Sequence, residues 1–159
     1  MIHIGIDPGA AGAIAVLDSK GALHAVFDMP ADAVKVGKTS RNRVSAAGVA
    51  AILGQFIGAS AIIEAVNAMP GQGVSSSFAF GRALGIVEAA CAAQEISVTL
   101  ATPQQWKKAT GCPTGKDGAR ARACQVFPAD AERFRRVKDD GRAEAALIAW
   151  HGWKAARTA

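Results

Sequence analysis

The first 29 residues of the chain form three strand-length apolar runs separated by short turn signals. The runs are "IHIGID", "AGAIAVLD" and "ALHAVFDM", and they are rich in Ile, Val and Phe, which favour strands. Pro8-Gly9 separates the first two runs, and Lys20-Gly21 separates the second from the third. Connections this short join antiparallel neighbours. The sequence therefore predicts an antiparallel three-stranded meander, which any fold of this chain must accommodate.

The rest of the chain alternates helical and strand-like patterns. Strand patterns lie in "SAIIEAV" and "ISVTLATP", and helical patterns lie over residues 45–59, 77–95, 104–110, 119–127 and 139–156. This order predicts an α/β fold: a five-stranded mixed sheet, made of the meander and two further strands, flanked by helices. Residues near 30–44 show no sustained period and many small or charged side chains, so we expect a mobile basic loop there.

At 159 residues the chain has the length of one ordinary domain, and we expect a single domain over residues 1–159. Half of the residues are hydrophobic and 19% are charged, which is a globular composition. No apolar run approaches the roughly 20 residues of a membrane span, and no secretion signal precedes the first strand, so no membrane partner is expected. Cys91, Cys112 and Cys124 lack metal-ligand spacing, which favours reduced thiols in a cytoplasmic protein.

The net charge of +5 is unevenly placed along the chain. Residues 107–138 hold nine Lys and Arg against three Asp and Glu. A second basic cluster, Lys35, Lys38, Arg41 and Arg43, lies in "KVGKTSRNR". Such segregation suits a polyanion such as nucleic acid. A solvated basic surface is the plainer interpretation, and charge alone leaves both open.

Carboxylates stand at the ends of three separate predicted elements. Asp7 ends the first strand, Glu64 ends the fourth, and Asp139, Asp140 and Glu144 open the last helix. If the first and fourth strands are neighbours, Asp7 and Glu64 lie near each other. Asp140 and Glu144 are four residues apart and share one helix face. Clustered carboxylates favour Mg²⁺ or Mn²⁺ over zinc, and two such ions can activate a water and stabilise the leaving oxygen at a phosphodiester.

Most of these carboxylates also have a plainer explanation. Asp7, before Pro and Gly, is typical of a side chain that binds nearby backbone in a turn. Asp139 and Asp140 suit the start of a helix, where they cap the backbone and complement its dipole. Glu64 has no local partner in its apolar strand, which favours a functional role. Taken together, the three motifs indicate a metal site more strongly than any one of them does.

The acidic segments resemble those of a known family. "IGIDPGAAGAIAV", "IIEAV" and "KDDGRAEAALIA" resemble, in the same order, the acidic motifs of the RuvC-type Holliday junction resolvases, which have a ribonuclease H-like fold. "MPGQGVSSSFAFGRALG" and "VTLATPQQWKK" resemble the branch of that family found in bacteriophages, prophages and plant chloroplasts. The resemblance runs from Ile2 to Trp150. It implies a crossover junction endodeoxyribonuclease with a ribonuclease H-like fold.

The resemblance also implies a catalytic site. By its motifs, Asp7, Glu64, Asp140 and Glu144 are the catalytic residues and bind two divalent ions, Mg²⁺ with Mn²⁺ as an alternative. Related sequences often have histidine where this chain has Asp140, which leaves Asp139 as an alternate ligand. We favour Asp140 because one helical turn places it beside Glu144. The family acts as a homodimer that makes paired nicks in strands of like polarity at a four-way DNA junction.

By the same resemblance, the "MPGQGVSSSF" loop enters the junction and contacts bases near the cut. Phe78 and Phe80 are suited to stack on an unpaired base, although both also fit core positions along a helix, which we favour for Phe80. Trp106 is expected to be the core anchor of a short helix whose lysines face phosphates. The residues expected to contact DNA are Met69, Gly71, Gln72, Ser75, Phe78, Lys107, Lys108, Lys116, Arg120 and Arg122.

Two other functions fit parts of the pattern. One is a branched-DNA-binding protein without cleavage, against which the intact Asp7, Glu64 and Glu144 argue. The other is an ATP-binding protein of the actin and sugar-kinase type, which also begins with an acidic strand end and a Gly turn. That type needs two such domains, for which 159 residues are too few.

Overall fold

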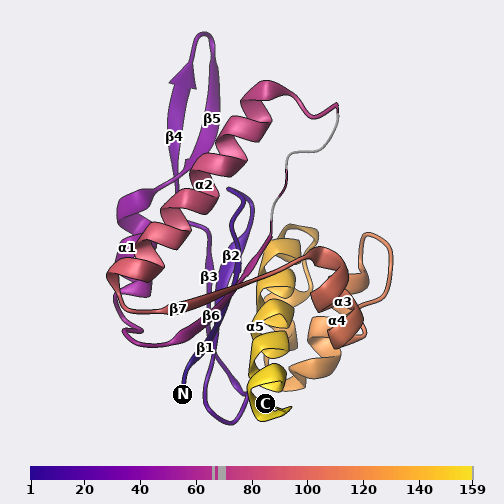
Figure 1. Ribbon diagram of the computed structural model, residues 1–159. Helices are drawn as coiled ribbons and strands as arrows, with labels where there is room; N and C mark the ends of the chain where they lie inside the picture. The colour runs from indigo at the N-terminus through magenta and orange to yellow at the C-terminus, as the bar shows by residue number, and fades with distance from the viewer. Residues whose placement is uncertain (66, 68–70, 159) are drawn as a thin grey trace.

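The computed structural model describes residues 1–65, 67 and 71–158. A five-stranded sheet lies between two layers of helices, with α1 and α2 on one face and α3, α4 and α5 on the other (Figure 1). The strands are β1 (His3–Asp7), β2 (Ala13–Leu17), β3 (Leu23–Asp28), β4 (Ala31–Val36), β5 (Thr39–Val44), β6 (Ser60–Glu64) and β7 (Ser97–Ala101). The helices are α1 (Ala46–Leu53), α2 (Val74–Ala93), α3 (Pro103–Thr110), α4 (Gly118–Val126), α5 (Asp140–Thr158) and the short 3₁₀ helices η1 (Pro128–Phe134) and η2 (Val137–Asp139). In the described part of the chain, no helix is long and apolar enough to cross a membrane.

The sheet has the strand order β3-β2-β1-β6-β7. The first three strands pair antiparallel, while β6 pairs parallel with both β1 and β7. This confirms the predicted meander with two further strands. It also confirms that the first strand and the strand that ends in Glu64 are neighbours, since Ile6 pairs with Ile63.

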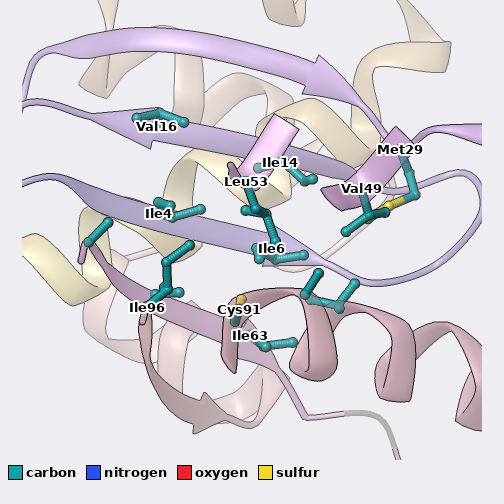
Figure 2. Packing of buried hydrophobic residues seen from close by; sticks show 14 of the residues in the cluster. Ile4, Ile6, Ile14, Val16, Met29, Val49, Leu53, Ile63, Cys91 and Ile96 are labelled. Atoms are coloured by element: carbon teal, nitrogen blue, oxygen red, sulfur yellow. The ribbon is translucent and has the colours of Figure 1, made fainter. Parts of the chain in front are cut away.

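Side chains alternate across the sheet and divide the interior into two cores. Ile4, Ile6 and Ile63 point toward α1 and α2, where they pack with Leu53 and Cys91 (Figure 2). Residues one position out of phase point toward the other face, so Ile62 packs in the second core with α5. The side chains of Asp7 and Glu64 therefore belong to the face that α5 covers.

Two glycines let α5 approach the first strand closely. A Cβ atom on Gly5 would lie 2.2 Å from the carbonyl oxygen of Ala145. A Cβ atom on Gly141, in the first turn of α5, would lie 2.4 Å from the carbonyl oxygen of Ala11. Both distances are too short for any other residue without movement of backbone. Because α5 is seated this closely, Glu144 in its second turn comes near the end of β1.

The segment near residues 30–44 is a β-hairpin rather than the expected loop. β4 and β5 pair antiparallel from Ala31 and Val44 at the base to Val36 and Thr39 at the tip. Gly37 makes the turn with a φ of 62°, a conformation that glycine adopts without strain. These two strands were not predicted from the sequence because the hairpin is exposed over most of its length. Without a buried face, a strand needs no alternating apolar pattern. In Figure 1 the hairpin extends beside the N-terminal half of α2.

Candidate active site

Asp7 and Glu64 lie at the carboxyl ends of two adjacent parallel strands. Each follows the last residue of the β1 and β6 pairing, Ile6 and Ile63, and each is partly exposed. In open α/β sheets this edge forms the usual binding crevice. The backbone N–H of Gly9 donates a 3.3 Å hydrogen bond to Oδ1 of Asp7, which holds the carboxylate in the turn. The turn role predicted for Asp7 thus coexists with its place in the crevice.

The start of α5 adds further carboxylates to this edge of the sheet. Asp140 and Glu144 line one cavity of about 500 Å³ together with Lys107 and Lys116. Asp139 instead turns away from that cavity and is 1% exposed. Asp140 therefore shares the environment of Glu144, as the helical spacing predicted.

The carboxylate of Asp139 is occupied by hydrogen bonds from Arg136, three residues before it. Its carboxylate accepts hydrogen bonds from the backbone N–H of Arg136 at 2.9 Å and from Nη2 of the Arg136 guanidinium at 2.9 Å. Although burial opposes it, these bonds hold the pKa of Asp139 below its ordinary value. Asp139 thus stabilises the turn that leads into α5, which is the capping role its position suggested.

Three carboxylates at the edge interact strongly with one another. Burial first, and then the charges of Glu64 and Glu144, raise the pKa of Asp7 to about 7, against the hydrogen bond from Gly9 and the charge of Lys107. Burial and the charge of Glu64 also raise the pKa of Glu144, which Lys107 opposes. Closely spaced carboxylates resist ionisation in this way unless a cation lies between them. A cation bound among these carboxylates would therefore be favoured.

Helix α3 contributes two contacts to the acidic residues. Its N-terminus is fixed by a reciprocal capping box in which the Thr102 hydroxyl accepts from the N–H of Gln105 and the Gln105 side chain accepts from the N–H of Thr102. The next residue, Trp106, is fully buried and donates a 2.9 Å hydrogen bond from Nε1 to Oε1 of Glu64. Lys107 Nζ lies 3.6 Å from Oε1 of Glu144. Trp106 is the core anchor that was predicted, and it also orients a carboxylate.

The donor set suits a hard divalent cation, because burial and neighbouring carboxylates raise the pKa of Asp7 and of Glu144, and carboxylate oxygens are the ligands that Mg²⁺ and Mn²⁺ prefer. As the side chains lie, however, no three Asp, Glu, His or Cys residues among those described form a group ready to hold a metal ion. Glu64 and Glu144 are instead turned toward Trp106 and Lys107.

The predicted DNA-contacting cations fall into two groups. Lys108 and Lys116 are exposed, and Lys107 is partly exposed beside the acidic edge. Arg120, by contrast, has a side chain 12% exposed and donates to Oδ1 of Asp140 at 2.6 Å and to the carbonyl oxygen of Arg135. Arg120 therefore holds Asp140 in place.

Arg122 has structural partners as well. Its Nε donates a 2.8 Å hydrogen bond to the carbonyl oxygen of Thr110, and its guanidinium lies 5.5 Å from the centre of the Trp150 ring. These contacts join α3, α4 and α5. A phosphate contact by Arg122 would have to add to them or replace them.

The predicted junction loop is described in part. Met69 lies outside the described residues. Gly71 is exposed and Gln72 partly exposed, ahead of the first residue of α2. Ser75 and Phe78 are both exposed on the first turns of α2. Phe78 is 74% exposed and Phe80 39%, so neither packs in the core, and the preference for a core position of Phe80 is wrong.

The sequence did not reveal two contacts with the acidic residues, that of Trp106 with Glu64 and that of Arg120 with Asp140. A usable signal was present for Trp106, since a buried indole N–H needs an acceptor and the strand carboxylate Glu64 lacked a local partner. Arg120 carried no comparable signal, because its pairing with Asp140 spans twenty residues. Its salt bridge depends on how α4 packs on α5.

The sheet order and the acidic crevice define a nuclease of the ribonuclease H-like class. A family model described as "Crossover junction endodeoxyribonuclease RuvC" matches residues 3–128, and the chain belongs to this family. Two similar structures are a Thermus thermophilus RuvC in complex with a Holliday junction substrate (TM-score 0.67, 99% of this chain and 96% of that chain) and a second Thermus thermophilus RuvC (TM-score 0.64, 99% and 97%). Both are 18% identical to this chain and support its fold. No curated protein matches it. Family membership sets aside the kinase-like alternative.

Proposed function

We propose that this chain resolves four-way DNA junctions by paired symmetric nicks, as a homodimer that hydrolyses phosphodiesters with two divalent ions. The observation that carries the proposal is the coupling of Asp7, Glu64 and Glu144 at one edge of the sheet. Burial and the charges of Glu64 and Glu144 raise the pKa of Asp7 to about 7, and a cation placed among these carboxylates would offset their repulsion. Family membership and the junction-bound Thermus relative supply the substrate class.

Asp7, Glu64, Asp140 and Glu144 would hold the ions, with Asp139 retained in its structural position. Mg²⁺, or Mn²⁺ in its place, would supply Lewis-acid chemistry there, lowering the pKa of a bound water and offsetting charge on the leaving oxygen. Arg120 fixes Asp140 through a 2.6 Å contact, and Trp106 fixes Glu64 through a 2.9 Å contact. These two donors orient the carboxylates from outside the crevice.

Lysines would position the DNA strand around this acidic edge. Lys116 and Lys107 line the same cavity as Asp140 and Glu144, which supports a role for both in binding the phosphates that flank the reacting one. Lys107 has a second task, because it lies 3.6 Å from Glu144 and offsets part of the negative charge. Lys108 is exposed on the same helix and extends the basic surface.

The branch of the family and the residues that contact bases are proposed from the sequence resemblance. The segment "MPGQGVSSSF" supports membership of the phage, prophage and chloroplast branch and a role for Met69, Gly71, Gln72 and Ser75 in contacting bases. Cys91, Cys112 and Cys124 are all free thiols, in keeping with a cytoplasmic site of action.

One assay tests the proposal directly. The purified chain is incubated with a synthetic four-way junction, a linear duplex and a flap, with and without Mg²⁺, and the nick positions are mapped on all strands. We expect paired nicks in the junction only, and only with Mg²⁺. Asp7→Asn and Glu64→Gln should abolish nicking and leave junction binding intact. Tight junction binding without nicks by the unaltered chain would instead favour a non-cleaving branched-DNA-binding protein.

A further inference from the structure

The β4–β5 hairpin projects from the same edge of the sheet as the acidic residues. Asp7 pairs with Ala13, and Ala13 pairs with Asp28, so these residues form one row across β1, β2 and β3. Since both pairings are antiparallel, β3 runs parallel to β1 and its last residue, Asp28, lies at the edge where Asp7 lies. The chain enters β4 three residues later, and Figure 1 shows the hairpin extending beyond the sheet beside the N-terminal half of α2.

Positive charge is concentrated on this hairpin. Residues 31–44 hold four cations and one acid, and all four cations are exposed. These cations are Lys35, Lys38, Arg41 and Arg43. None of them forms an ion pair with another residue in the described part of the chain. The neighbouring half of α2, residues 74–87, holds no Asp or Glu. The positive charge of the hairpin is therefore available to an external anion.

The two faces of the hairpin have different surroundings. Val34 and Arg41 pair with each other on the face that lines a cavity against α2. Lys35 and Ser40 pair one position out of phase, so their side chains lie on the opposite face, which turns away from α2. Lys38 lies at the tip, in the turn between the two strands. Lys35 and Lys38 are therefore placed on the outer face and the tip, where a polyanion can approach them.

Two hydrogen bonds fix the direction in which the hairpin points. Nη1 of Arg41 donates a 3.0 Å hydrogen bond to the Ser75 hydroxyl, which joins the hairpin to the start of α2. Nη1 of Arg82 donates a 3.0 Å hydrogen bond to the carbonyl oxygen of Val44, which joins the base of the hairpin to the same helix. Lysines on a support that is already fixed lose less conformational freedom when they bind a partner.

The length of the hairpin sets how far from the acidic edge it can reach. Each of its strands has six residues, which at about 3.4 Å per residue gives a length of about 20 Å. A DNA duplex rises by about 3.4 Å per base pair, so the same length spans about six base pairs. Because the hairpin starts at the edge that carries Asp7, a duplex with its reacting phosphate at this edge can lie alongside the hairpin over that length.

We propose that the β4–β5 hairpin binds the phosphate backbone of one duplex arm of the junction, within roughly six base pairs of the nick. Lys35 and Lys38 contact the phosphates, while Arg41 keeps the hairpin in position through Ser75. These contacts carry no sequence preference, because the backbone is the same at every base pair. The inference rests on the proposed function, and it gives the protein a second DNA-binding surface beside the acidic edge.

The first test compares lysines in two corresponding turns. Lys38 lies between β4 and β5, whereas Lys20 lies between β2 and β3, at the end of the sheet opposite Asp7. Junction affinity is measured in EDTA over a range of salt concentrations. Lys38→Gln should bind several-fold more weakly at low salt than the unaltered chain and lower the salt dependence by about one phosphate contact, and Lys35→Gln/Lys38→Gln by about two. The control, Lys20→Gln, should match the unaltered chain in affinity and salt dependence.

The second test locates the contact on the DNA. Junctions are prepared with blocks of neutral methylphosphonate linkages at stepped distances from the nick, in one pair of opposite arms at a time. The unaltered chain should bind one of these junctions several-fold more weakly than the unmodified junction. Lys35→Gln/Lys38→Gln should bind these two junctions equally, because the contact is already lost.

Three results would count against these expectations. An unchanged salt dependence of Lys35→Gln/Lys38→Gln would overturn the proposal, and so would equal sensitivity of this variant and the unaltered chain to every neutral block. A loss of dimer mass in light scattering of this variant would also overturn it, by assigning the hairpin to an interface between copies. Failure of the unaltered chain to nick any junction in Mg²⁺ refutes the proposed function instead, and the affinity comparisons in EDTA still test the hairpin.

Discussion

The indole Nε1 of Trp106 donates a 2.9 Å hydrogen bond to Oε1 of Glu64. The two residues come from different elements, α3 and the end of β6, and the Trp106 ring is fully buried. Because the Trp106 ring is fully buried, its Nε1 cannot follow the Glu64 carboxylate if that carboxylate moves. The contact therefore fixes one oxygen of Glu64.

Trp106→Phe should keep most of the buried apolar surface and remove the donor. Because hydrogen bonds to charged groups contribute about 1.5–3 kcal/mol, we expect nicking of a junction to fall tenfold or more, with junction affinity little changed. Trp153→Phe is the matched control, since the Trp153 indole donates to the carbonyl oxygen of Ser19, far from the acidic edge in the chain. Equal single-turnover rates for the two variants would remove Trp106 from the site.

The raised pKa of Asp7 predicts a pH dependence of stability in the metal-free protein. In the unfolded chain this carboxyl loses its proton near 3.8, whereas in the folded chain it keeps the proton until about pH 7. The folded state then binds more protons between these values, so the contribution of Asp7 to stability falls as the pH rises from 4 to 7, by at most about 4 kcal/mol.

The comparison that isolates this effect is between the unaltered chain and Asp7→Asn in EDTA. The variant should gain in Tm relative to the unaltered chain as the pH rises from 4 to 8, because asparagine does not ionise. Mg²⁺ should reduce the difference at pH 8 by binding the ionised carboxylates. A Tm difference that is flat across this range would show that Asp7 ionises normally.

Substitution of Asp139 should mainly lower stability, whereas substitution of Asp140 should mainly lower activity. Asp139→Asn removes the charge from a residue that is 1% exposed and bound by Arg136, so we expect a loss of roughly 1–3 kcal/mol of unfolding free energy. Asp140→Asn acts at a half-exposed side chain in the cavity shared with Glu144, so nicking should fall while the Tm changes little. Denaturant titration and junction nicking, run on both variants, check the assignment. The reverse pattern would make Asp139 the metal ligand.

The strands that carry Asp7 and Glu64 could be predicted from sequence because both lie in buried runs with clear turn signals. Their neighbouring positions in the sheet were an assumption that the structure confirms through the pairing of Ile6 with Ile63. The β4–β5 hairpin could not be predicted in the same way, since its side chains are mostly exposed and carry no alternating apolar pattern. The pairing of Arg120 with Asp140 depends on helix packing, which a local pattern does not specify.

The seating of α5 on β1 predicts how glycine substitutions act. In Gly141→Ala, the new Cβ would lie 2.4 Å from the Ala11 carbonyl oxygen, so either the start of α5 or the turn after β1 must move. We expect a loss of roughly 1–3 kcal/mol of stability, as overpacking commonly causes, and a larger loss of nicking, because Glu144 follows Gly141 by less than one helical turn. Urea titration gives the first quantity and single-turnover nicking gives the second.

The matched control is Gly85→Ala, in the middle of α2. A Cβ atom there meets nothing within 4 Å, and alanine has the higher helix propensity, so this variant should be as stable as the unaltered chain or more stable by up to about 1 kcal/mol. If Gly141→Ala keeps both its stability and its nicking rate, then α5 can shift without cost, and the position of Glu144 does not depend on this close contact. If it loses stability but nicks at the normal rate in conditions where it is folded, the contact serves the fold alone. Loss of nicking by the fully folded variant is the expected result, because the carboxylates from β1, β6 and α5 meet only when α5 lies this close to the sheet.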